Sequence, residues 1–142
     1  MNEVAKSQWV RLWDVVGLSP LMIYIGLKNG KLKNMDRQFL IGAGFLTLFY
    51  NLRNLIADRD IPTEPYSKVP LGISSVYQHS ETSKRMGNAM RLVDVFAYGP
   101  MMLKIGAQNK MEPWEEIFMY VGGVMTVFVN GMNYLANRNG VT

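Results

Sequence analysis

Two stretches of this chain are repeated, and the repetition restricts the fold more than any other feature of the sequence. Residues 11–29 match residues 91–109 at 9 of 19 positions, and residues 39–59 match residues 118–138 at 8 of 21. The offset changes from 80 to 79 residues between the two blocks, where a loop can absorb the difference. Each half is therefore predicted to be one supersecondary unit, and the two units are expected to pack with approximate two-fold symmetry.

Each repeat carries the signals of two helices joined by a short turn. Polar capping residues and Asn-Gly pairs bound the apolar segments, as is typical of helix ends. Pro20 and Pro100 lie at equivalent positions inside the first helix of each repeat, where the missing backbone N–H is expected to kink the helix. The predicted fold is all-α, with two tandem-duplicated antiparallel helical hairpins that form a four-helix bundle. The helices are expected over residues 7–28, 34–57, 81–108 and 113–137.

A polar segment at residues 60–80, which we call the strap, separates the two repeats. A loop of this length is rare within a compact domain unless it is functional or disordered. Two interpretations of the strap are therefore open, namely a flexible spacer and a segment that lies along a partner protein. The predicted organisation is a first hairpin at 1–59, the strap as a long extended linker, and a second hairpin at 81–142. The extended conformation is predicted from three prolines, Pro62, Pro65 and Pro70.

The apolar helices are compatible with a membrane or with a buried core. Residues 117–135 contain no charged residue, which is close to the ~20 residues that cross a bilayer. Small residues within the helices and aromatic residues near their ends also favour a membrane. The other helices have shorter uncharged runs and ionisable residues, which favour a soluble bundle. If the four helices span the membrane, the side with the termini and the strap carries nine basic residues and the other side carries six. This excess favours termini in the cytoplasm or the particle interior.

Four polar residues recur in both repeats at positions that the hairpin geometry brings to similar heights. Asp14 precedes the first turn by about as many residues as Asn51 follows it, so their side chains are expected at the same level. Arg11 lies three residues before Asp14 and can pair with it on one helix face. Because a buried carboxylate needs a partner, we predict an Arg–Asp–Asn cluster that locks the open end of each hairpin. Its members are Arg11, Asp14, Asn51 and Asn54 in the first repeat and Arg91, Asp94, Asn130 and Asn133 in the second.

The sequence gives little support for catalytic or metal-binding chemistry. The chain has no cysteine and a single histidine, His79 in the strap, so neither a zinc site nor a nucleophile–histidine pair is expected. Asp14 and Asp94 could form a carboxylate dyad across the symmetry axis, but each has local partners, and we favour a structural role for both. A net charge of +4 with acids and bases mixed along the chain does not support specific nucleic-acid binding. No enzyme activity, cofactor or metal is predicted.

Both repeats share one order of polar residues, prolines and asparagines. It runs Arg-Leu-x-Asp-Val, then Ser-Pro or Gly-Pro, then a helix end with Phe-x-Asn-x-x-Asn. This pattern resembles small duplicated hydrophobic helical-hairpin proteins of phages and large DNA viruses. The repeats themselves depart from each other where Ser19 stands for Gly99 and Leu52 for Gly131. The resemblance implies a virion or virus-associated membrane protein without chemistry of its own.

These features together favour a non-enzymatic structural protein that is embedded in, or associated with, a membrane. The expected partners are a lipid bilayer and a protein that contacts residues 60–80, which in a virus would be the capsid shell. A homo-oligomer is compatible with the same features. The resemblance implies a location in a virion membrane or a host inner membrane. Two other classes stay open, namely a soluble four-helix interaction or assembly module and a small transporter or pore built from repeats.

Overall fold

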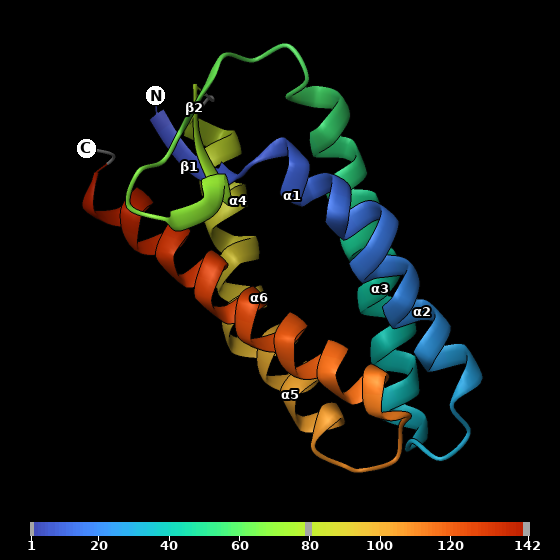
Figure 1. Ribbon diagram of the computed structural model, residues 1–142. Helices are drawn as coiled ribbons and strands as arrows, with labels where there is room; N and C mark the ends of the chain where they lie inside the picture. Colours follow the sequence, from blue (N-terminus) through green and yellow to red (C-terminus); the bar gives the residue numbers. More distant parts are fainter. Residues whose placement is uncertain (1, 79–80, 141–142) are drawn as a thin grey trace.

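The computed structural model describes residues 2–78 and 81–140, and most of these residues are helical. The first hairpin consists of the consecutive segments α1 (Gln8–Trp13), η1 (Asp14–Leu18) and α2 (Ser19–Lys28), and of the returning helix α3 (Asn34–Ala57). The second hairpin follows the same plan with α4 (Glu81–Val93), η3 (Asp94–Tyr98), α5 (Gly99–Gly106) and α6 (Pro113–Asn139). The helical prediction is confirmed (Figure 1). His79 lies outside the described residues.

A π-helical turn precedes the proline in the first arm of each hairpin. The backbone N–H of Ser19 donates to the carbonyl of Asp14, five residues earlier, and Gly99 donates to Asp94 in the same way. Pro20 has no N–H to donate, and in a regular α-helix its ring would collide with the carbonyl four residues before it. The wider π turn gives the ring room, and the helix continues beyond it. The irregularity thus falls where the sequence predicts a kink.

The two hairpins have their turns at the same end of the molecule (Figure 1). Asn29 in the first turn donates from Nδ2 to the backbone oxygen of Lys110 in the second turn, at 2.9 Å. Gln108 donates from Nε2 to Asp36 Oδ2 at 2.8 Å. These hydrogen bonds join one turn to the other, so the repeats run parallel rather than inverted.

An apolar core joins the hairpins next to these turns. Ile25 and Ile105 occupy equivalent positions in the two repeats, and both are 0% exposed. Elsewhere the two helices of each hairpin pack mainly on each other, so the predicted four-helix bundle is not confirmed. Flexible methionine side chains fill the space between the hairpins. The remaining large residues of this core are Met22, Leu32, Leu40, Met102 and Met119.

Two equivalent glycines allow the helices within each hairpin to approach closely. A Cβ on Gly44 would lie 2.7 Å from Ile23 Cγ1 and 3.1 Å from the backbone oxygen of Ser19. A Cβ on Gly123 would lie 3.0 Å from the backbone oxygen of Gly99. The close approach therefore falls beside the π turn in both repeats, as expected for small residues at helix interfaces.

Replacing Gly44 by alanine is expected to lower the free energy of unfolding by about 1–3 kcal/mol, because the added methyl group overpacks this contact. Gly42 offers a matched control on the same helix, since a Cβ there meets nothing within 4 Å. Gly42→Ala should raise stability by up to about 1 kcal/mol through helix propensity. Denaturant titration of the two variants measures both changes, and equal effects would contradict the close packing at Gly44.

A three-stranded antiparallel sheet is the main difference from the predicted fold. Its strands are β1 (Asn2–Lys6), β2 (Thr63–Pro65) and β3 (Ser74–Gln78), in the order β1-β3-β2. Val76 at the centre of β3 faces Val4 on one side and Glu64 on the other. The all-α prediction is therefore wrong for the N-terminus and the strap. β1 is far from β3 in the sequence and β2 has only three residues, so no local pattern predicts this sheet.

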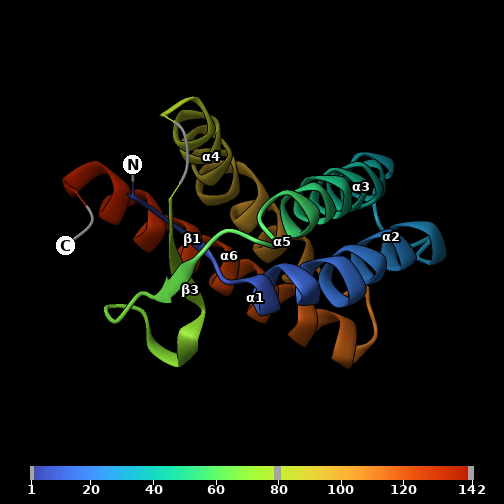
Figure 2. The same cartoon turned by 90° about the horizontal axis from the view of Figure 1, so that it is seen from above.

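The strap folds back onto its own chain instead of forming a free extended linker. Ser74 donates from Oγ to Asn133 Oδ1 on α6 at 2.7 Å, and Trp9 on α1 donates from Nε1 to the backbone oxygen of Gly72 at 2.8 Å. Figure 2 shows the sheet next to α6 in the left half of the view, with the helices of the first hairpin in the right half. A second apolar core supports this contact and includes Val4, Tyr66, Val69, Ile73, Val129 and Ala136.

Candidate functional site

The repeated polar residues lie away from the turns, where β1 enters between the two hairpins. Asp14 and Asp94 are the first residues of the π turns η1 and η3. Arg11 and Arg91 lie three positions earlier on the same arms, and both are buried. The structure brings these residues to one level of the molecule, but it connects them differently from the predicted cluster.

The two arginines pair with acids that the sequence analysis did not select. Arg11 Nη1 donates to Asp58 Oδ2 at 2.5 Å, and Arg91 Nη2 donates to Glu3 Oε1 at 2.6 Å. Asp14 instead accepts a hydrogen bond from Lys6 Nζ at 2.8 Å. The predicted pairing of each arginine with the aspartate three residues later is therefore wrong. Each guanidinium is paired with a carboxylate that is distant in sequence, whereas Asp14 and Asp94 line the spaces between the hairpins.

One of the positions at which the repeats differ explains how β1 is held. Asn137 occupies the position in the second repeat that Asp58 occupies in the first. Its Oδ1 accepts the N–H of Val4 at 2.7 Å, and its Nδ2 donates to the oxygen of Val4 at 2.8 Å. The amide thus caps the outer edge of β1, and the adjacent Glu3 supplies the carboxylate that Arg91 lacks in its own repeat.

The predicted asparagines bind backbone or strap groups rather than the aspartates. Asn51 donates from Nδ2 to the backbone oxygen of Thr47 at 2.9 Å, and its equivalent Asn130 donates to Thr126 at 2.8 Å. Asn133 accepts the hydrogen bond from Ser74. Asn54 takes part mainly through its backbone oxygen, which lies 3.3 Å from Arg11 Nη1.

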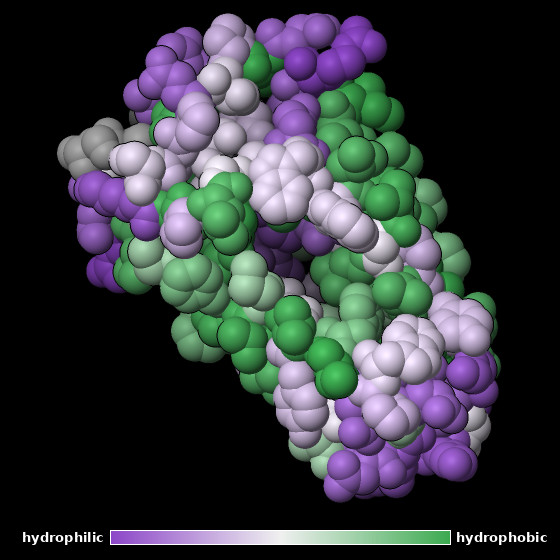
Figure 3. Space-filling model, in the orientation of Figure 1, coloured by the Kyte–Doolittle hydropathy of each residue, from purple (hydrophilic) through white to green (hydrophobic). Residues whose placement is uncertain are grey.

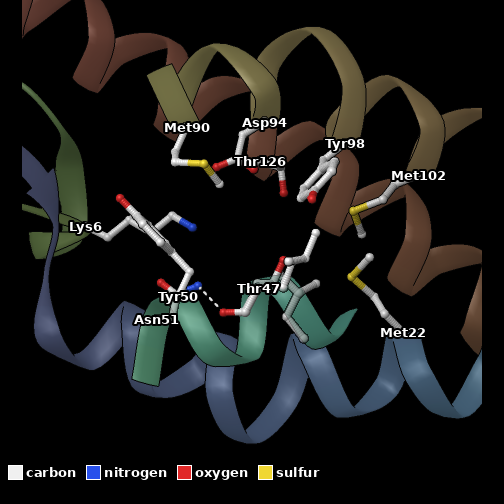
Figure 4. Close-up of a pocket in the computed structure, with 12 residues that line it drawn as sticks. Lys6, Met22, Thr47, Tyr50, Asn51, Met90, Asp94, Tyr98, Met102 and Thr126 are labelled. Atoms are coloured by element: carbon white, nitrogen blue, oxygen red, sulfur yellow. Dashed lines mark hydrogen bonds between the residues drawn. The ribbon is translucent and has the colours of Figure 1, made fainter. Parts of the chain in front are cut away.

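Lys6 at the end of β1 reaches the space between the two repeats. Figure 4 shows its ammonium nitrogen between Asn51 on one wall and Asp94 on the opposite wall. Burial lowers the pKa of Lys6, but the carboxylates of Asp14 and Asp94 raise it by more, so the pKa lies above its ordinary value. Lys6 therefore carries a positive charge at neutral pH.

Asp94 is the one carboxylate at this level that forms no ion pair with a cation among the described residues. Lys6, Arg11 and Arg91 each have a carboxylate within hydrogen-bonding distance, namely those of Asp14, Asp58 and Glu3. Neither a hydrogen bond nor an ion pair joins Asp94 to another described residue. With every group ionised, Asp94 is left as one uncompensated negative charge at this level, and burial makes such a charge costly.

Asp94 lines a small internal space that we call the chamber. Its volume is about 30 Å³, which is enough for about two water molecules. Three methionine side chains close it on the apolar sides (Figure 4). The polar groups that line it come from both hairpins and from β1, and they are Lys6, Thr47, Tyr50, Asn51, Asp94, Tyr98 and Thr126.

A larger groove opens on the surface beside the chamber. It has a volume of about 590 Å³ and lies between the first arm of hairpin one and α6. Lys6, Leu18 and Thr126 line both spaces. Figure 3 shows the hollow at the centre of this face, with hydrophilic groups at its floor and hydrophobic groups around it.

The arrangement favours charge pairing over proton-transfer or metal chemistry. Within the described part of the chain, no group of three or more His, Cys, Asp or Glu side chains is placed to hold a metal ion. Asp14 already accepts a hydrogen bond from the Lys6 ammonium. The alternative of a carboxylate dyad stays a prediction, now with Lys6 close to both of its members.

Replacing Asp14 and Asp94 by asparagine is expected to have opposite effects. Asp14→Asn leaves the Lys6 ammonium without its charged acceptor and should lower the free energy of unfolding by about 1–3 kcal/mol. Asp94→Asn, at the equivalent position of the other repeat, should leave stability unchanged or raise it, because it removes the uncompensated charge. Thermal unfolding of both variants under identical conditions measures this. Equal losses of stability would contradict the pairing of Lys6 with Asp14.

Sequence reasoning missed Glu3, Lys6, Asp58 and Asn137. A signal existed for the last two, because they are aligned polar residues at the end of the repeat. Glu3 and Lys6 precede the repeat and have no counterpart in it, so the duplication could not select them.

Comparison with known proteins assigns no family to this arrangement. No protein-family model matches the chain, and no curated protein and no solved structure shows significant similarity to it.

Proposed function

We propose that this chain is a non-enzymatic structural protein that is held in a membrane by its apolar faces and presents the strap to a protein partner. The buried ion pairs and the sheet would hold the two hairpins together at the strap end. The exposed helix faces would contact lipid.

One observation carries this proposal, namely a set of exposed large apolar side chains on the helices that we call the apolar belt. Phe49 is 62% exposed and Ile56 is 70% exposed on α3, and Phe96 is 77% exposed on η3. Soluble monomers rarely expose contiguous apolar patches of more than a few hundred Å². The belt comprises Leu12, Trp13, Val16, Phe45, Leu46, Phe49, Leu52, Ile56, Val93, Phe96, Ile117, Val121, Val124, Met125 and Phe128.

The length and burial of two helices support the same proposal. Gln8–Lys28 and Asn34–Ala57 are long and apolar enough to cross a membrane. Only 33% and 22% of their apolar windows, respectively, are buried inside the protein. A core helix of a soluble protein would be mostly buried, whereas a helix in lipid leaves its apolar side chains on the outside. Figure 3 shows hydrophilic residues gathered at the strap end and at the turn end, with hydrophobic residues between them.

The strap offers a surface for the partner on the polar end. All three residues of β2, Thr63–Pro65, are exposed, and Leu71 is 85% exposed at the tip of the strap. An exposed edge strand and an isolated apolar side chain are features that a partner can use. The resemblance to hairpin proteins of phages and large DNA viruses supports a virion membrane or host inner membrane as the location, with a capsid shell protein as the partner and the termini inside.

Flotation with lipid vesicles, followed by an alkaline carbonate wash, tests the membrane proposal. The protein is expected to float and to resist the wash, because the belt is buried in the hydrocarbon. A protein that stays monodisperse in buffer without detergent would contradict the proposal. In that case a soluble assembly module, with copies of the chain covering one another's belts, would explain the exposed residues.

The chamber favours a second candidate, a small transporter or pore. Lys6 and Asp94 place charged groups between the two repeats, and such groups within apolar helices often mark ion pathways. Ion flux into vesicles that contain the protein measures this function. The candidate requires flux that Asp94→Asn reduces, and vesicles as tight as protein-free ones would refute it.

A further inference from the structure

We propose that the groove between the first arm and α6 binds one hydrocarbon chain of a neutral lipid, with the uncharged polar head beside Lys6 and Asp14. This inference rests on the proposed membrane location and names a ligand that the location makes available. A monoacylglycerol, which joins one acyl chain to hydroxyl and ester groups, is the simplest lipid with this chemistry.

The walls of the groove are apolar along its length. Trp9 and Trp13 line one side and Trp114 lines the other, so all three tryptophans of the chain contact this space. Gly17 and Gly122 also line the groove and add no side chain to it. No segment among residues 2–78 and 81–140 fills it, and its volume of about 590 Å³ is within the ~300–1,000 Å³ of ligand sites.

The length of the groove suits an acyl chain. Its lining residues on α6 extend from Trp114 to Asn130, which corresponds to about 24 Å at ~1.5 Å per residue. Half of the ~30 Å hydrocarbon core, which is the depth available to one acyl chain, is about 15 Å. The groove can therefore hold one such chain and leave space for a head group at its polar end.

The charges at that end select a neutral head. Lys6 and Asp14 already neutralise each other at 2.8 Å. An anionic head would meet the carboxylate of Asp14, and a cationic head would compete with Lys6 for that carboxylate. A neutral head avoids both costs. Lys6 makes a hydrogen bond only to Asp14 among the described groups, so its remaining N–H donors can bind a hydroxyl or ester oxygen.

The groove is also continuous with the apolar belt. Ile117, Val121 and Met125 line it and are exposed, and all three belong to the belt that is proposed to face lipid. An acyl chain would reach the groove from the surrounding bilayer without crossing water.

The tryptophans provide a direct test. The full-length protein in detergent is titrated with a monoacylglycerol that carries bromine atoms on its chain, because bromine quenches nearby tryptophan fluorescence. Quenching is expected to saturate at one probe per protein. A fatty acid brominated at the same positions is expected to bind about tenfold more weakly or worse, because its head is anionic.

A matched pair of variants separates the groove from the general lipid surface. Val121 is 58% exposed and lines the groove, whereas Val124 on the same helix is 54% exposed and does not line it. Val121→Phe should fill the groove and weaken binding about tenfold or more. Val124→Phe adds the same atoms outside and should bind as the original chain does. Quenching that rises without saturation, or equal effects of the two variants, would overturn the proposal.

Failure of the groove proposal can be distinguished from failure of the membrane proposal, because the two are measured separately. Flotation and carbonate washing of the same preparations report membrane insertion, independently of quenching. A protein that inserts but shows no saturable quenching would overturn the groove ligand and leave the membrane proposal standing. Efficient disulfide cross-linking of a Met125→Cys variant to a second copy, with loss of quenching, would show that the occupant is another copy and would also overturn it.

Discussion

Glu3→Gln is expected to lower the free energy of unfolding by about 3 kcal/mol, the lower end of the range for removing one partner of a buried ion pair. The glutamine keeps an acceptor but not the charge, so Arg91 stays buried without a counter-ion. The side chains of Glu3 and Arg91 are 3% and 8% exposed. Denaturant titration of the single variants, and of the double variant Glu3→Gln with Arg91→Met, measures the loss and the coupling between the two residues.

The surface pair Arg59–Asp60 supplies the control, because its side chains are 78% and 83% exposed. Asp60→Asn should leave stability unchanged, as is usual for exposed ion pairs. A small effect of Glu3→Gln, similar to that of Asp60→Asn, would mean that β1 does not complete the second hairpin.

Ile25→Ala and Ile105→Ala are each expected to destabilise the protein by about 2–5 kcal/mol. Both side chains are 0% exposed and lie in the core beside the turns. Because they occupy equivalent positions in the repeats and share one core, the two effects should be of similar size and not strictly additive. Thermal or denaturant unfolding of the single and double variants provides these values.

Ile56→Ala and Ile117→Ala are the matched controls on the apolar belt, where the side chains are 70% and 63% exposed. The same truncation there should cost far less, because no protein cavity forms. A loss at Ile56 as large as that at Ile25 would indicate that the belt is packed against another protein surface.

The hairpins could be predicted from the sequence because their signals are local. Helices expected over 7–28 and 34–57 are found over residues 8–28 and 34–57, because the apolar runs that predict them lie within the helices themselves. The π turns fall directly before Pro20 and Pro100 for the same reason. The duplication then extends each observation from one repeat to the other.

The sheet and the ion pairs could not be predicted in this way, because their partners are distant in sequence. The sequence of residues 2–6 does not by itself predict a strand, and the strand depends on pairing with residues 74–78. The spacing of Arg91 and Asp94 correctly places them on one helix, but the choice between Asp94 and Glu3 depends on where β1 enters. That position is set in part by Asn137, which holds Val4 and stands where the first repeat has Asp58.

Labelling of single cysteines most directly tests whether the apolar belt faces lipid. The chain has no cysteine, so Phe49→Cys on the belt and Asp60→Cys beside the strap each introduce one reactive group. In vesicles that have a water-soluble maleimide on both sides of the membrane, the Asp60→Cys variant should react at once. The Phe49→Cys variant should react only after denaturation, although its side chain is 62% exposed in the isolated protein. Equal reaction of the two variants in intact vesicles would contradict a belt buried in the bilayer.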